Sequence, residues 1–229
     1  MATVEIRTVD AGASAADKAA MKRVLTAAFG AYAPHMAIWH NAAANAALMD
    51  DMVEHFLEQH DVAAAYLGGE VAGVALWVQP GHDLRGANAA AARALSLLPP
   101  KRGAFLAEKA IPALDALAEA CLPGAETEWH SLFEWHSLFV LGTEPRHQGR
   151  GVGAALLAHK VAQAGGTPLC VHTNTERNVR FYERAGFALR ASHSLRLPFG
   201  ATWEDRFLSL PADAETRAMR ELADEAGEG

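Results

Sequence analysis

The sequence predicts a mixed α/β fold, because three observations point to it. Segments with the alternation of β-strands and segments with helical spacing follow one another along the chain. A Gly-dense turn at residues 148–153 joins a strand pattern to a run of good helix formers. The chain has 229 residues, of which 51% are hydrophobic, so one large core can be built. We expect residues 1–210 to form one domain and the charged, Ala-rich residues 211–229 to be a partly disordered or loosely helical tail.

Seven segments have the pattern expected of β-strands. Residues 4–9, VEIRTV, alternate between apolar and polar side chains. Residues 62–67 and 71–78 are joined by Gly68-Gly69, a pair typical of a hairpin turn. The remaining strand patterns are the segment that ends in VLGT, residues 168–173, residues 188–197 and residues 204–210.

The helical segments lie between these strands. Residues 14–29 begin with the capping candidates Ser14 and Asp17, and the segment 32–34 breaks this helix. Further helices are expected at 41–59, at 151–164, and at 177–185, where Gly186 is a typical C-terminal residue. Residues 84–122 are helical and Ala-rich, interrupted at Pro99-Pro100, and we expect them to form a helical insertion between strands 3 and 4.

Composition excludes several function classes. The net charge of −7 argues against nucleic acid as a partner, because phosphate binding requires clustered Lys and Arg. Cys121 and Cys170 are too few and too far apart for a disulfide framework or a zinc site, so we expect no metal and interpret both as buried apolar residues. No apolar run reaches membrane-spanning length and the N-terminus has no apolar signal region. A cytoplasmic protein that does not bind membranes is therefore expected.

Residues 128–139 read EWHSLFEWHSLF, a tandem duplication of one hexapeptide. Only the second copy joins VLGTEP, so we expect the second copy to form the strand and the first to be surplus. A period of six is even, so the first copy can extend the strand without inverting its faces. It can also loop out or mediate association with another subunit. Six extended residues span roughly 20 Å, too far for shared chemistry between the copies.

The strand–turn–helix segment from residue 140 onward predicts an anion site. The first N–H groups of a helix lack internal partners, and glycines allow a phosphate to approach the backbone. A P-loop is excluded because no Gly-Lys-Ser/Thr follows. The dinucleotide pattern fits loosely, but the next strand ends in HTN at 172–174 without the required acidic residue. The pattern Q-x-x-G-x-G is matched by Gln148, Gly151 and Gly153.

Three pieces in order give the sequence its resemblance to a known family. They are LGTEP at 141–145, QGRGVG at 148–153, and NTERNVRFYERAGF at 174–187. With them the chain resembles the GNAT acetyltransferase superfamily over roughly residues 135–187, and more finely its puromycin N-acetyltransferase-like branch. The resemblance implies the GNAT fold: a central mixed twisted sheet of about seven strands flanked by helices.

The resemblance implies acetyl-CoA as co-substrate. The helix N-terminus after the Gly turn would bind the pyrophosphate through its backbone amides, with the charge of Arg150 added. Leu141 and Thr143 would bind the pantetheine arm through their backbone, and Gly142 would keep the strand slim there. The implied cofactor-binding residues are Leu141, Gly142, Thr143, Gln148, Gly149, Arg150, Gly151, Val152, Gly153, Ala154 and Asn178.

The resemblance makes Tyr182 the general acid that protonates the thiolate of CoA. The general base stays open among His172, His136 and Glu134, with His172 favoured because histidine titrates near neutrality. Three more side chains are candidates to line the acceptor site, namely His35, His40 and Trp135.

The sequence therefore predicts an N-acetyltransferase that acts on a primary amine of a small molecule, by direct attack of the amine on the thioester. Two alternatives stay open: a protein or peptide acetyltransferase, and a non-catalytic acyl-CoA-binding sensor. A homodimer is possible, and no nucleic acid partner is expected.

Overall fold

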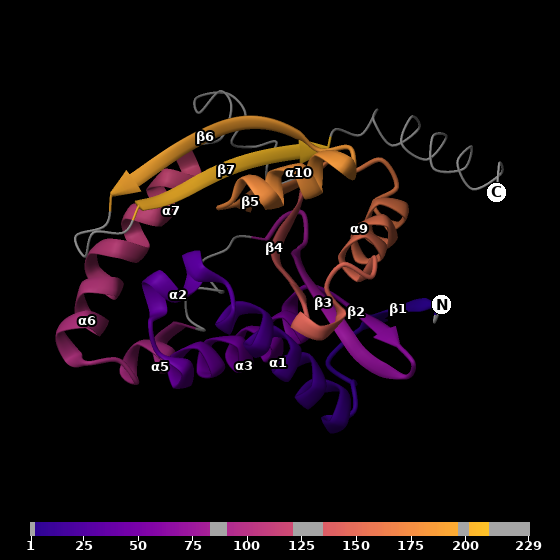
Figure 1. The fold of residues 1–229 in the computed structure, drawn as a ribbon, viewed down its shortest axis with the longest axis horizontal. Coiled ribbons are helices and arrows are strands. Elements are labelled where there is room, and N and C mark those ends of the chain that lie inside the picture. The colour runs from indigo at the N-terminus through magenta and orange to yellow at the C-terminus, as the bar shows by residue number, and fades with distance from the viewer. Residues whose placement is uncertain (1–2, 83–90, 121–134, 197–201, 211–229) are drawn as a thin grey trace.

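The computed structural model describes residues 3–82, 91–120, 135–196 and 202–210, and its centre is a seven-stranded sheet (Figure 1). The strands are β1 (Val4–Val9), β2 (Asp61–Leu67), β3 (Glu70–Val78), β4 (His136–Thr143), β5 (Leu169–Thr173), β6 (Ala188–Arg196) and β7 (Thr202–Leu210). Their order in the sheet is β1-β2-β3-β4-β5-β7-β6. Only β4 and β5 pair in parallel among the pairs described, so the sheet is mixed, as predicted.

Helices flank both faces of the sheet. They are α1 (Ala15–Gly30), α2 (Ala33–Trp39), α3 (Ala42–Gln59), α5 (Ala91–Ser96), α6 (Pro100–Phe105), α7 (Ile111–Ala120), α9 (Val152–Gln163) and α10 (Glu176–Arg184). A π-helical turn, Leu106–Ala110, joins α6 to α7, and a 3₁₀ turn, Pro145–His147, follows β4. The sequence predicted α1 and α3 within one residue, but it missed α2 after Tyr32. Pro34 was interpreted as a breaker, whereas it stands in the first turn of α2, where proline is tolerated.

Each face of the sheet has its own apolar core, because side chains alternate between faces along a strand. On β2, Val62, Ala64 and Tyr66 pack with α1, α2 and α3, and we call this side the α1 face. Ala63 and Ala65 pack on the opposite side with α9 and α10, which we call the α9 face. The continuous apolar run of β2 in the sequence is thus explained by burial on both sides.

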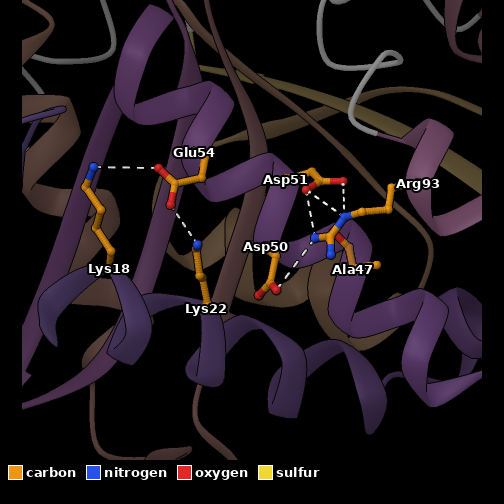
Figure 2. A network of polar contacts seen from close by, with 7 residues as sticks. All are labelled: Lys18, Lys22, Ala47, Asp50, Asp51, Glu54 and Arg93. Atoms are coloured by element: carbon orange, nitrogen blue, oxygen red, sulfur yellow. Dashed lines mark hydrogen bonds and ion pairs between the residues drawn. The ribbon is translucent and has the colours of Figure 1, made fainter. Parts of the chain in front are cut away.

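The predicted helical insertion between β3 and β4 is present, and its described part comprises α5, α6 and α7. Polar contacts join α5 to α3, as Figure 2 shows: Arg93 forms ion pairs with Asp51 at 2.7 Å and Asp50 at 3.6 Å. The same guanidinium donates a hydrogen bond to the carbonyl oxygen of Ala47. From α5 the insertion runs along one end of the molecule to α7, which lies against β6 and β7 (Figure 1). The insertion therefore covers part of the α1 face.

The cysteine and membrane predictions concern parts of the chain outside the candidate site. Cys170 is buried, and burial raises the pKa of its thiol to about 12, so it behaves as an apolar residue. No helix in the described ranges is both long and apolar enough to cross a bilayer. Cys121, the first hexapeptide copy at 128–133, Glu134 and the tail 211–229 lie outside the described residues.

Candidate functional site

The centre of the candidate site is the place where the two parallel strands part. The pairing joins His136, Ser137 and Leu138 of β4 to residues 169–171 of β5 and stops there, although β4 continues to Thr143. The N–H of Glu144 donates to Ala72 of β3, which fixes the phase of the alternating backbone groups. The N–H groups of Leu141 and Thr143 therefore point away from β3, toward the side that β5 has left.

A β-bulge marks the same place. Leu76 of β3 pairs with Val140 and Trp77 pairs with Leu138, so Phe139 is an extra residue in β4. In consequence Phe139 and Val140 both pack on the α1 face, where the ring of Phe139 stacks on Phe56 with centroids 5.3 Å apart. Leu138 packs on the α9 face. Bulges re-aim backbone and side chains and are frequent beside active sites.

The Gly-rich segment forms the predicted turn into a helix. Gly149 and Gly151 have φ of 75° and 79°, the left-handed region that favours glycine, and Gly151 is the N-cap of α9. The first intrahelical bond runs from Ala155 to Gly151, so the N–H groups of residues 152–154 have no partner within the helix. Gly149, Arg150, Gly151 and Ala154 are exposed. Unpaired N–H donors at the positive end of a helix, next to an exposed turn, fit a phosphate group.

Three residues of this segment, Gln148, Arg150 and Gly153, have intramolecular contacts that the sequence did not predict. The Gln148 side chain donates to the carbonyl oxygen of Thr143 at 3.3 Å, which ties the turn to the end of β4. A Cβ atom on Gly153 would lie 3.2 Å from the ring of Phe181, so glycine permits close contact between α9 and α10. The Nη1 of exposed Arg150 lies 3.2 Å from His147 Nδ1.

Gly142 also differs from its expected role. A Cβ atom there would lie 2.6 Å from Leu25 Cδ2 and 3.3 Å from Ala28 Cβ, both on α1. The missing side chain therefore allows α1 to approach the sheet on the α1 face. Its effect on the gap beside β5 is indirect.

Tyr182 is buried on α10, where its ring packs edge-on against Phe181 and Phe187. Burial, and to a lesser degree the neighbouring Tyr32, raises the pKa of this phenol well above its ordinary value. The side chain is therefore protonated at all physiological pH values. Its hydroxyl makes no hydrogen bond to any residue that the structure describes.

Tyr32, between α1 and α2, was missed by the sequence analysis. Its hydroxyl donates to Asn174 Oδ1 at 3.4 Å and accepts from Asn178 Nδ2 at 3.3 Å. Asn178 also donates to Thr173 Oγ1 at 3.0 Å, so its amide holds the end of β5 against α10. Burial raises the pKa of Tyr32 as well. This network places a second phenol beside Tyr182.

His172 lies on β5, one residue beyond the last pair with β4. Its Nδ1 is 2.8 Å from Asp205 Oδ2 on β7, and its ring packs on Phe207 with centroids 5.1 Å apart. Val171 packs on the α9 face, so alternation places His172 on the α1 face. Asp205 was not predicted. Tyr182 and His172 thus stand on opposite faces of the sheet, beside the same strand end.

His136 is not brought together with these groups. It lies at the start of β4, with Nδ1 3.8 Å from Asp61 Oδ2, while Lys160 of α9 forms an ion pair with the same carboxylate oxygen at 2.5 Å. Burial and then the charge of Lys160 lower the pKa of His136 to about 4. Lys160 belongs to α9, so His136 is on the α9 face, opposite to His172. This environment favours a structural role for His136.

The other acceptor-site candidates have structural contacts. His35 is buried and bonds Asn45 at 2.8 Å, and burial lowers its pKa to about 4, so it links α2 to α3. His40 is exposed and ends α2 in the left-handed conformation. Trp135 stacks on Phe207, with centroids 6.5 Å apart. Within the described ranges, no group of three or more His, Cys, Asp or Glu side chains is arranged to hold a metal ion.

The segment that contains these residues matches a known protein family. Residues 105–189 match the model of the acetyltransferase (GNAT) domain family. This segment runs from the end of α6 through β4, α9, β5 and α10 into β6. It therefore contains the parting strands, the Gly-rich turn, His172 and Tyr182.

Solved structures share the fold over nearly the whole chain. A histone acetyltransferase HPA2 and related acetyltransferase from Corynebacterium glutamicum is 22% identical, with TM-score 0.60, over 92% of this chain and 97% of that one. A putative acetyltransferase from Salmonella typhimurium with its cofactor acetyl-CoA is 17% identical, with TM-score 0.51, over 91% and 94%. A Drosophila melanogaster polyamine N-acetyltransferase is 15% identical, with TM-score 0.50, over 91% and 100%.

The family match covers the functional segment, and the fold likeness extends over the flanking helices and strands. The chain therefore shares the fold of these solved structures, and its residues 105–189 match the acetyltransferase (GNAT) domain model.

Proposed function

We propose that the protein is an acetyl-CoA-dependent N-acetyltransferase that transfers acetyl to a primary amine of a small molecule. One observation carries the proposal: β4 and β5 part at the Phe139 bulge, and the free edge of β4 leads to the N-terminus of α9. An extended pantetheine arm can pair with that edge as an added strand does, while its diphosphate meets the helix amides.

The residues present fit the cofactor. The N–H groups of Leu141 and Thr143 point to the unpaired side of β4, and those of residues 152–154 have no helical partner. Both glycines of the turn, Gly149 and Gly151, have open space where a Cβ would stand, so the backbone is approachable. Bound acetyl-CoA would supply the activated acetyl group. The backbone N–H groups beside the parted strands would polarise its carbonyl as oxyanion donors.

The acid and the base would act from the two faces of the sheet. His172, on the α1 face, would accept the proton of the attacking amine at Nε2. Tyr182, on the α9 face, would donate its phenol proton to the departing thiolate, and the raised pKa of that phenol keeps it in the donor form. A carbon–nitrogen bond would form and the carbon–sulfur bond would break, with the amine proton passing to His172 and the phenol proton of Tyr182 passing to the thiolate.

The insertion favours a small acceptor over a peptide. α7 lies against β6 and β7, and its Leu114 packs on the core of the α1 face, the face that carries His172. The insertion would therefore cover part of an acceptor groove on that face. The same insertion before β4 supports the finer proposal that the protein belongs to a puromycin N-acetyltransferase-like branch.

Calorimetric titration with acetyl-CoA, and then with CoA, tests the cofactor assignment. We expect one micromolar site per chain. Detection of free thiol then tests turnover with an aromatic amine, spermidine, an amino-acid amide and a lysine-containing peptide. Release of CoA with a small amine supports the proposal. Release with the peptide alone would favour a peptide acetyltransferase, binding without turnover would favour a sensor, and absence of binding would refute the proposal.

A further inference from the structure

The proposed base needs one defined tautomer. A neutral imidazole carries its proton on one nitrogen and accepts at the other, and the hydrogen bond made by the first fixes the choice. The only hydrogen bond of the His172 ring to a described residue is from Nδ1 to Asp205 Oδ2, at 2.8 Å. A carboxylate accepts and does not donate, so the proton belongs on Nδ1. Nε2 is left with its lone pair.

We propose that Asp205 is a positioning residue that holds His172 as the Nδ1–H tautomer and directs Nε2 toward the attacking amine. The catalytic purpose of this positioning rests on the proposed function, whereas the contact between Asp205 and His172 is seen in the structure itself. The carboxylate is buried, with 7% of its side chain exposed, whereas 27% of the His172 side chain is exposed. The pair thus has an anchored end within the sheet and an accessible end at its surface.

The surroundings hold the ring in this orientation. Phe207, fully buried on β7, pairs with His172 in register and packs on its ring, and Trp135 stacks on Phe207. With the ring packed and Nδ1 bonded, rotation of the imidazole would break both contacts. A base held in this way does not need to be oriented at the moment of reaction.

The two charged neighbours of Asp205 along β7, Glu204 and Arg206, form ion pairs with other residues or with each other. Arg206, the next residue on β7, donates to the carbonyl oxygen of Asn174 and forms an ion pair with Glu176 at 3.0 Å. Glu204 lies 3.6 Å from the same Arg206. His193 on β6 faces Asp205 across the β6–β7 ladder. Glu204 is therefore a suitable control, because it is a carboxylate on the same strand whose described partner is Arg206.

The tautomer can be measured directly on the free protein. Nitrogen-15 NMR of the imidazole at alkaline pH, with His172 assigned by its absence in His172→Gln, distinguishes Nδ1–H from Nε2–H. We expect Nδ1–H in the wild type and loss of this preference in Asp205→Asn, with no change in Glu204→Gln. An Nε2–H tautomer in the wild type would overturn the proposal. The wild-type tautomer alone decides this test, and its measurement needs neither an acceptor nor acetyltransferase activity.

Kinetics then show whether Asp205 acts through His172. We expect Asp205→Asn to lower kcat by about tenfold or more, up to the roughly 10²–10⁴ that a positioned base contributes, without changing the KM for acetyl-CoA. In the His172→Gln background the same change should cost nothing further, because the two residues act as a unit. An equal loss in both backgrounds would overturn the proposal. If the wild type releases no CoA with any amine while the Nδ1–H tautomer is present, the proposed function fails and the positioning stands.

Discussion

Gly142 of β4 and Leu25 of α1 are in direct contact: a Cβ atom on Gly142 would lie 2.6 Å from Leu25 Cδ2. Leu25 is fully buried, and the Cβ of Ala28 would lie 3.3 Å away on the same helix. Because Leu25 is buried, its side chain could make room only by moving within the core. The packing of α1 on β4 therefore depends on glycine at this position.

Replacement of Gly142 by alanine should destabilise the protein by about 1–3 kcal/mol, the usual cost of added atoms in a packed core. Gly30→Ala is the matched control, because a Cβ there would lie 3.5 Å from Asn45 Nδ2, an ordinary contact. We expect this control to be neutral or slightly stabilising. Urea unfolding of both variants measures the difference. Equal midpoints would show that α1 does not press on Gly142.

The free energy of unfolding should fall as the medium becomes acidic, because His136 and His35 are held neutral. Both have pKa values lowered to about 4, from a reference of 6.5. Below pH 6.5 these histidines become protonated in the unfolded chain but stay neutral in the folded chain. The free energy of unfolding therefore decreases as pH falls from about 6.5 to about 4. Each histidine can contribute roughly 1–3 kcal/mol to this loss.

Urea unfolding of His136→Gln at pH 7.5 and pH 5 tests this assignment. The variant should show a smaller difference between the two pH values than the wild type does, because one group no longer titrates. His35→Gln should behave in the same way. A wild-type difference that persists unchanged in both variants would contradict the predicted linkage.

Phenylalanine at position 182 should separate chemistry from binding. The Tyr182 hydroxyl bonds none of the described residues, so its removal should leave the fold and the KM for acetyl-CoA unchanged. Loss of the proton donor should lower kcat by about 10²-fold or more. Steady-state kinetics at pH 8 check both parts, and an unchanged kcat would remove Tyr182 from the mechanism.

Tyr182→Phe should also change how the free energy of unfolding depends on pH in the alkaline range. The pKa of Tyr182 is raised by burial and then by Tyr32, so the folded state keeps the proton. Above pH about 10 the phenol ionises in the unfolded chain, and the wild type should lose stability as pH rises further. Unfolding of Tyr182→Phe at pH 8 and pH 10.5 should show less of this loss. An identical loss would indicate that other groups dominate.

Local patterns predicted most of the fold, because alternation, helical spacing and capping residues act over a few residues. The strand 4–9 and the cap of Ser14, which accepts from the N–H of Asp17, are examples. The bulge at Phe139 has no such local signal, because LFVL at 138–141 is a continuous apolar run that does not show which residues face which side of the sheet. It became visible only from the pairing with β3.

The parts of the site that escaped prediction are long-range contacts. Asp205 is 33 residues from His172, and Tyr32 is 142 residues from Asn174, so no spacing rule connects them. His136 was a reasonable candidate by residue type and strand position. Its face was decided by Asp61 and Lys160, which come from β2 and α9.

The tandem hexapeptide provides a pair of identical tryptophans for comparison. In the second copy Trp135 stacks on Phe207, with an angle of 21° between the rings, and His136 opens β4 with a hydrogen bond from its N–H to Pro168. Since the copies are identical, deletion of either one gives the same chain and cannot tell them apart. Point substitution can.

Trp135→Ala should destabilise the protein by about 2 kcal/mol, because a partly buried aromatic ring loses its packing. Trp129→Ala should change stability by less than about 0.5 kcal/mol. This expectation follows from the hypothesis that the first copy is surplus. Urea unfolding and acetyl-CoA titration of both variants provide the comparison. If Trp129→Ala proves as costly as Trp135→Ala, or if it weakens acetyl-CoA binding, the first copy has a function and the duplication is not merely tolerated.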